Sequence, residues 1–150
     1  TRCRYQGKRQ RGADLVEPFN VQDEDRIEPG MVLVIDPENP GKLRIADDDY
    51  DRTVAGIVSG ANGISPGLSM SHQGTQADGT LPVALTGRLF ALADADYGAI
   101  QPGDLLTTSR TPGHVMKVTD YSRAHGSIIG KAMTALDEGR GYVLVLVSLQ

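Results

Sequence analysis

Apolar residues along this chain occur in short runs with a two-residue alternation, as in Leu43 and Ile45, which flank Arg44. This period is typical of strands with one buried face, and no segment keeps the 3.6-residue period of an amphipathic helix. The segment that comes closest to a helical pattern, residues 87–100, predicts instead a strand over residues 87–92 followed by a turn. The pattern therefore predicts an all-β protein.

The same order of elements occurs twice in the sequence. Residues 27–41, IEPGMVLVIDPENPG, and residues 100–113, IQPGDLLTTSRTPG, each place an apolar run between two Pro-Gly pairs. Proline favours the first central position of a type II turn and glycine supplies the positive φ of the second, so each pair predicts a turn. Three further pairs of similar segments follow in the same order: 42–52 with 114–123, 53–61 with 127–135, and 78–87 with 139–150.

Two copies of this unit, residues 27–87 and 100–150, predict a compact barrel or sandwich rich in glycine and proline, with pseudo-twofold internal symmetry. Residues 13–150 would form one domain, because the chain is too short for two ordinary ones. The copies differ at residues 61–79, a long polar loop for which the second copy has only TALDEGRG. Because such loops in compact domains are often functional, this one is a candidate for contact with a partner.

The longest apolar run, YVLVLVSL at residues 142–149, is apolar at positions of both parities. A strand of this kind is buried on both sides, either at the centre of a barrel or against a neighbouring subunit. An exposed strand edge is also a template for pairing with another chain, so we expect self-association through strand edges and through strands that are apolar on both faces. The candidate interface residues in this segment are Tyr142, Leu144, Leu146 and Leu149.

Charge divides the chain into a basic arm and an acidic body. Residues 1–12 hold five cations and no acid and so carry a charge of +5. Because the whole chain has a net charge of −4, residues 13–150 carry −9. Such an arm is suited to docking on the acidic surface of an identical neighbour; a disordered terminus or tag remnant, and contact with nucleic-acid phosphates, are the alternatives. Nucleic acid is disfavoured, because the body is acidic and aromatic residues for base stacking are few. The cations of the arm are Arg2, Arg4, Lys8, Arg9 and Arg11.

No motif predicts catalysis, a metal site or a cofactor. His72 lies near Ser69, Ser71 and Asp78, but the sequence has no nucleophile elbow and no Ser-x-x-Lys motif. The three histidines are far apart, and the acidic run at residues 47–51 lacks the glycine and distal glutamate of an EF-hand loop. Phosphate-binding glycine motifs are absent from the sequence as well.

Several short motifs of the sequence resemble those of a known class of proteins. ADLVEPFNV, VAGIVS, PGDLLTTS followed by PGHVMK, and IIGKA together resemble a C-terminal β-domain of bacterial and phage tail-fibre-like and cell-surface proteins, over about residues 13–150. The second half is also similar to the decoration proteins of phage capsids. The resemblance implies a structural domain, extracellular or on a cell surface or virion, that forms trimers or larger arrays and caps, decorates or joins a fibre or particle.

Two alternatives remain open. VAGIVSG, which contains Ser59, is similar to a phrase in the self-cleaving trimerisation domains of tail-spike-like proteins, although no serine precedes Ser59 at the start of this chain and the helical segments of those domains are missing. A surface- or carbohydrate-binding module would use the 61–79 loop, with Ser65, Ser69, His72 and Gln73 as candidate partner residues. That loop lacks the aromatic faces that sugar sites generally use.

The sequence thus predicts a non-enzymatic assembly domain whose partner is itself, as a trimer or an open polymer. No apolar run approaches the ~18 residues of a membrane span. The chain opens on Thr1, which indicates a processed product or a piece of a longer protein. Cys3 is the lone cysteine, so a disulfide within the chain is excluded.

Overall fold

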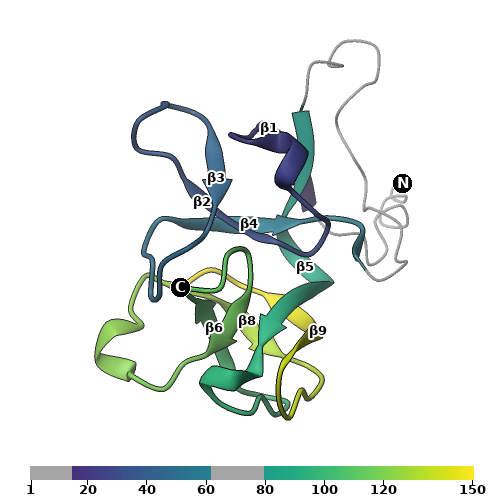
Figure 1. Cartoon of the computed structure of the whole chain (residues 1–150), viewed down its shortest axis with the longest axis vertical. Coiled ribbons are helices and arrows are strands. Elements are labelled where there is room, and N and C mark those ends of the chain that lie inside the picture. Colours follow the sequence, from purple (N-terminus) through teal and green to yellow (C-terminus); the bar gives the residue numbers. More distant parts are fainter. Residues whose placement is uncertain (1–14, 62–79) are drawn as a thin grey trace, which may run out of the picture.

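The computed structural model describes residues 15–61 and 80–150, and they form an all-β protein (Figure 1). Nine strands belong to one continuous hydrogen-bonded sheet that curls on itself. The helical elements named here are 3-10 helices of three residues each: η1 (Glu24–Arg26), η3 (Ala95–Tyr97) and η4 (Tyr121–Arg123). The all-β prediction is therefore confirmed.

The first half of the sheet is built around strand β2. It pairs antiparallel with β3 on one side and with β4 on the other, β4 pairs with the first part of β5, and β5 pairs with β1. A single parallel bridge from Val21 to Leu43 brings the end of β1 beside β3. The strands are β1 (Leu15–Asn20), β2 (Val32–Ile35), β3 (Leu43–Ile45), β4 (Val54–Val58) and β5 (Thr80–Asp94).

The second half closes into a five-stranded barrel. The order β5, β7, β6, β8, β9 returns to β5, because β9 pairs antiparallel with residues 87–94 of β5 over eight residues. The remaining strands are β6 (Leu105–Thr108), β7 (Val115–Lys117), β8 (Ile128–Ala132) and β9 (Arg140–Val147). The first-half strands β1–β4 are joined to this barrel through β5.

The pairing pattern confirms the internal duplication. β6 pairs with β7 and β8 as β2 pairs with β3 and β4, and β8 pairs with β9 as β4 pairs with β5. Even the irregularities match, since the β2–β4 register shifts between Leu33 and Val34 and the β6–β8 register shifts between Leu106 and Thr107. The glycines of all four predicted Pro-Gly turns have positive φ: Gly30, Gly41, Gly103 and Gly113.

A glycine at the same place in each copy explains the fourth-position match in the sequence. A Cβ on Gly56 would lie 2.6 Å from the carbonyl oxygen of Ala84, and a Cβ on Gly130 would collide with the carbonyl oxygen of Leu146. In both copies, β4 or β8 therefore approaches the backbone of the next strand too closely for a side chain.

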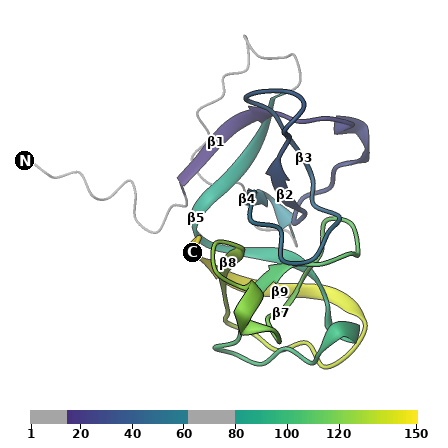
Figure 2. The ribbon, with the colours of Figure 1, turned by 90° about the vertical axis from the view of Figure 1, so that its left-hand side faces the viewer.

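The duplication extends beyond the predicted bounds. Residues 87–94 of β5 relate to β7 and β9 as β1 relates to β3 and β5, and the parallel bridge from Ala93 to Val115 matches the one from Val21 to Leu43. We therefore call residues 15–86 the first repeat and residues 87–150 the second repeat. The strands predicted at 78–87 and 87–92 form one strand, which continues through Gly87 at φ +109° and runs through both repeats (Figures 1 and 2).

One apolar core joins the two repeats. Its largest cluster contains the interior of the second-repeat barrel, such as Leu106 and Val143, together with Val32 and Ile57 of the first repeat. A second cluster around Leu33 fills the first repeat. In Figure 2 the first repeat stands directly on the second, with β4 nearest the lower barrel.

Tyr50 anchors the first repeat to the second. Its ring packs with Met116 and Val118, and its hydroxyl accepts hydrogen bonds from the backbone N–H groups of Thr119 (3.0 Å) and Asp120 (2.9 Å). Burial, the largest single influence, acts to raise the pKa of the phenol, but the hydrogen bond with the Thr119 hydroxyl (3.3 Å) and then these two backbone bonds lower it below its usual value. The counterpart in the second repeat, Tyr121, is 67% exposed.

Candidate assembly surface

Strand β9 has one buried and one outward face. Val143 and Val145 are fully buried inside the barrel, whereas Tyr142 is 39% and Leu146 47% exposed. β9 pairs with both β5 and β8, so it is an internal strand of the closed barrel. Within the described chain, however, the run is not buried on both sides: the candidate residues Tyr142, Leu144 and Leu146 all lie on the outward face.

Register extends this face onto the neighbouring strands. Phe90 lies opposite Leu144 and Leu92 opposite Tyr142, and directly opposed residues of an antiparallel pair share a face. Met133 follows the buried Ala132 at the end of β8, donates its N–H to the carbonyl of Leu144, and is 40% exposed. We call these six residues the β9 surface: Phe90, Leu92, Met133, Tyr142, Leu144 and Leu146.

The β9 surface has an aromatic contact at its Tyr142 end and a hollow at its Leu146 end. The rings of Phe90 and Tyr142 meet edge to face, with centroids 6.4 Å apart. Next to Leu146, a hollow of about 170 Å³ opens between β6, β8 and the segment after β9. It is lined by Leu105, Ile128, Gly130, Lys131, Leu146, Ser148 and Gln150.

The remaining predicted interface residue, Leu149, lies beyond the end of β9 and is 43% exposed. The chain around it is held by reciprocal backbone bonds, since the N–H of Gln150 donates to the carbonyl of Ile128 and the N–H of Ile128 donates to that of Gln150, both at 3.0 Å. Leu149 is therefore presented near the hollow from a fixed backbone.

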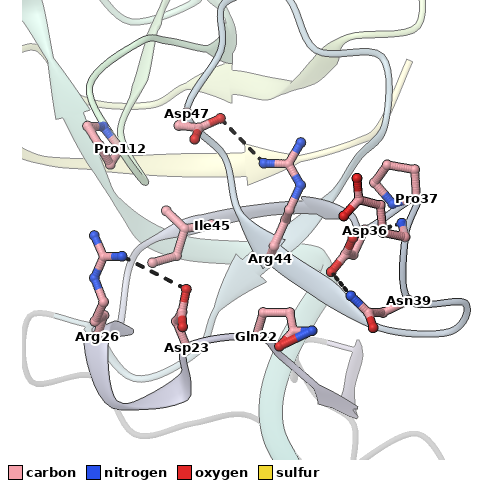
Figure 3. Close-up of a pocket in the computed structure, with 11 residues that line it drawn as sticks. Gln22, Asp23, Arg26, Asp36, Pro37, Asn39, Arg44, Ile45, Asp47 and Pro112 are labelled. Carbon is pink, nitrogen blue, oxygen red and sulfur yellow. Dashed lines mark hydrogen bonds and ion pairs between the residues drawn. The ribbon is translucent and has the colours of Figure 1, made fainter.

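A polar cleft lies elsewhere, on the first repeat (Figure 3). This cleft measures about 510 Å³ and is lined by residues of the η1 turn, the β2–β3 turn and β3. Its charged groups pair within the cleft: Arg44 lies 3.4 Å from Asp47, and Arg26 lies 3.9 Å from Asp23. The cleft residues are Gln22, Asp23, Arg26, Asp36, Pro37, Glu38, Asn39, Arg44, Ile45, Asp47 and Pro112.

Asp36 in this cleft has a structural role. Its carboxylate accepts hydrogen bonds from the side-chain amide of Asn39 (2.8 Å) and the N–H of Glu38 (3.0 Å), which closes the β2–β3 turn. The bond from Asn39, followed by that from Glu38, lowers the pKa of Asp36 below its usual value. Since its lone pairs are used in this way, Asp36 is a turn-forming residue and not a free base.

Ser59 and the acidic run at residues 47–51, which the sequence raised as a candidate cleavage residue and a candidate ion site, have surroundings that the structure defines. Ser59 is 6% exposed at the end of β4, where its N–H donates to the carbonyl of Pro82. The acidic run at 47–51 is a turn whose Asp49 faces the guanidinium of Arg123 at 3.3 Å. In residues 15–61 and 80–150, no group of three or more acidic, histidine or cysteine side chains is placed to hold a metal ion.

Two sets of predicted residues fall outside the described ranges. They are the arm residues Arg2, Arg4, Lys8, Arg9 and Arg11, and the loop residues Ser65, Ser69, His72 and Gln73. Both sets stay predictions.

Sequence reasoning missed half of the β9 surface: Phe90, Leu92 and Met133. The signal was present in the alternation of residues 88–93, RLFALA, but these residues are joined to β9 only by the strand register, which no local pattern specifies.

Within the described chain, no helix has the length and apolar character required to cross a membrane. When the sequence was compared with known proteins, no family model matched it and no curated protein matched it.

Proposed function

We propose that this chain is a non-enzymatic assembly domain that associates with copies of itself. The observation that supports the proposal best is the β9 surface, where six apolar side chains, half-buried or exposed, lie together on β5, β9 and the end of β8, with the charged Arg88 and Lys131 beside Leu146. Contiguous exposed apolar patches of this kind are typical of protein–protein contacts.

The energetics favour covering this surface. Fully burying one leucine-sized side chain contributes about 1.5–3 kcal/mol, and several such residues lie side by side on β5, β8 and β9. The backbone beneath them is already paired on both sides within a closed barrel. Association would therefore use the face of the barrel and leave its strand pairing unchanged, which differs from the strand-edge contact that the sequence predicts.

The test is the mass in solution across the micromolar range, measured by sedimentation equilibrium. We expect the unmodified protein to be oligomeric and Leu146→Asp to weaken association about tenfold or more, because the variant replaces an exposed apolar side chain of the contact with a charge. Tyr121→Asp is the control: Tyr121 is 67% exposed but lies in η4, outside the β9 surface. A monomeric unmodified protein at all these concentrations would refute the proposal.

The finer role, as a cap, joint or decoration of a fibre or particle outside the cell or on a virion, is supported by the sequence resemblance alone. Residues 1–12 would tie one subunit to the next through their five cations. Removing residues 1–12 separates this contribution from that of the β9 surface: a lower oligomer mass after removal supports the arm, and an unchanged mass contradicts it.

A further inference from the structure

Strand register defines a matching row of side chains on the outer face of each repeat. In the first repeat, Val32 lies opposite Ile57 and Ile57 opposite Ala84. In the second, Leu105 lies opposite Lys131 and Lys131 opposite Leu146. Because the strands correspond as β2 to β6, β4 to β8 and β5 to β9, the two rows are counterparts.

The first row is covered by the second repeat. Val32, Ile57 and Ala84 are all fully buried and belong to the same apolar cluster as the second-repeat barrel. The turn between β6 and β7 contributes to this cover, because the N–H of Val32 donates to the carbonyl of Gly113 (2.9 Å) and the N–H of Gly113 donates to the carbonyl of Ala46 (2.7 Å).

The second row is open. Lys131 is exposed, Leu146 is 47% exposed, and the 170 Å³ hollow lies between them and Leu105. Tyr50 covers the neighbouring part of this face, over Met116 and Val118, and Leu105 is partly buried against the same cluster, so the open part of the row is Lys131 and Leu146. The counterpart of the face that one repeat buries against the other is therefore without such a cover within the described chain.

The turn that corresponds to the β6–β7 turn is also open. This is the β2–β3 turn, residues 36–42, where Gly41 matches Gly113. A Cβ on Gly113 would lie 2.7 Å from Met31, whereas nothing lies within 4 Å of a Cβ on Gly41. Pro37, Glu38 and Pro40 are exposed at this turn, and hydrogen bonds to Asp36 already fix its shape.

The open row carries a positive charge that the covered row lacks, and this charge is opposite to that of an exposed acid in the turn. The second repeat places Lys131 where the first has the buried Ile57, and Glu38 is an exposed acid of the β2–β3 turn. A lysine flanked by two leucines fits the exposed carboxylate of Glu38, which lies between two prolines and four residues before the exposed Lys42 at the other end of the turn.

We propose that the open row of one copy, Leu105, Lys131 and Leu146, binds the β2–β3 turn of a second copy, with Lys131 facing Glu38. This inference rests on the proposed self-association and specifies its contact. The two surfaces differ, so the contact is head to tail, and it forms a ring if it closes or a filament if it does not.

The contact can be tested by reversing the charge on either side, because combining the two reversals should restore association. Lys131→Glu alone would face Glu38, and Glu38→Lys alone would face Lys131, so each variant is expected to associate about tenfold more weakly than the unmodified protein. An equimolar mixture of the two restores association, because every row then meets a turn of opposite charge. The double variant Lys131→Glu with Glu38→Lys restores it within one chain.

The control is Glu138→Lys, which reverses an exposed acid in the β8–β9 turn and is expected to leave the mass unchanged. Circular dichroism spectra of all variants verify the fold. If the unmodified protein is oligomeric but the single reversals keep its mass, or if the double variant fails to restore association, the row-to-turn contact is refuted while the assembly function stands. If the unmodified protein is monomeric, both are refuted.

Discussion

The two repeats share one strand ladder, yet their outer faces differ in burial. The first repeat places Val32, Ile57 and Ala84 in complete burial, whereas the second presents Lys131 and Leu146 to solvent at the matching positions. The ladder therefore does not determine which face is buried. Burial depends on what packs against the face, and the residue types follow it: a lysine is acceptable only where the repeat has no internal neighbour.

The same contrast holds for the tyrosines of the two Asp–Tyr turns. Tyr50 is 9% exposed and joins the repeats, and Tyr121 is 67% exposed. Similar sequence segments thus have different roles in the two repeats. Comparing the loss of stability caused by substitutions at corresponding positions measures how far the repeats have diverged.

The largest expected loss of stability comes from substituting the glycines at which neighbouring strands approach each other closely, a feature found in both repeats. Gly130→Ala forces a Cβ against the carbonyl oxygen of Leu146 and is expected to lower the free energy of unfolding by about 3 kcal/mol, at the upper end of overpacking effects. Gly56→Ala should have a similar effect in the first repeat, where the oxygen is that of Ala84. Urea denaturation measures both losses.

Gly41→Ala serves as the control for these substitutions. It has open space around the added Cβ and a φ of +85°, so only the backbone strain of about 1 kcal/mol applies. Equal losses for Gly41→Ala and Gly130→Ala would contradict the close-approach explanation.

The second prediction is that removing the hydroxyl destabilises the protein at Tyr50 but not at Tyr121. Tyr50→Phe removes the hydroxyl that accepts from the N–H groups of Thr119 and Asp120, and leaving such donors unpaired costs about 1–3 kcal/mol. Tyr121→Phe changes an exposed ring and is expected to be neutral within the error of a thermal unfolding experiment. A comparable loss in both variants would show that Tyr50 does not anchor the repeats.

The third effect is smaller and depends on pH. Asp94 of the second repeat accepts a 2.7 Å bond from Thr111 and faces Arg140 at 3.4 Å, and at the matching place the first repeat has the amide Gln22. Burial acts to raise the pKa of Asp94, but the bonds from Thr111 and the N–H of Asp96, with the Arg140 charge, lower it below 3.8.

Because the folded-state pKa of Asp94 is depressed, its ionised form stabilises the fold above the unfolded pKa of 3.8, and this contribution is lost as the pH falls through the folded pKa. Asp94→Asn is therefore expected to be less stable than the unmodified protein at pH 7, with the difference shrinking under acid. Urea unfolding at several pH values measures it, and Gln22→Asn is the matched change in the first repeat. A difference that grows under acid would contradict this assignment.

The strand content and the duplication could be predicted because local chemistry encodes them. Pro-Gly pairs fix turns by their own φ preferences, and Gly56 and Gly130 mark the same close contact in each copy. The extent of the repeats could not be predicted in this way. β1 belongs to the first repeat only through pairing with β5, and the strand through Gly87 joins segments that a glycine would ordinarily separate.

The candidate site was half predictable for a related reason. The apolar character of residues 142–149 is visible in the sequence, but whether Tyr142 and Leu146 lie inside or outside the barrel depends on register. Phe90 and Leu92 join them only because β5 and β9 are neighbours in space. The polar cleft was not predicted at all, since it brings together residues from three turns that share no sequence signal.

The continuous course of β5 has a mechanical consequence. Domains joined by a flexible linker can swing, but here the connection is itself a hydrogen-bonded strand of both repeats, with its bend at Gly87. A load applied to one repeat is therefore carried into the other along a paired backbone.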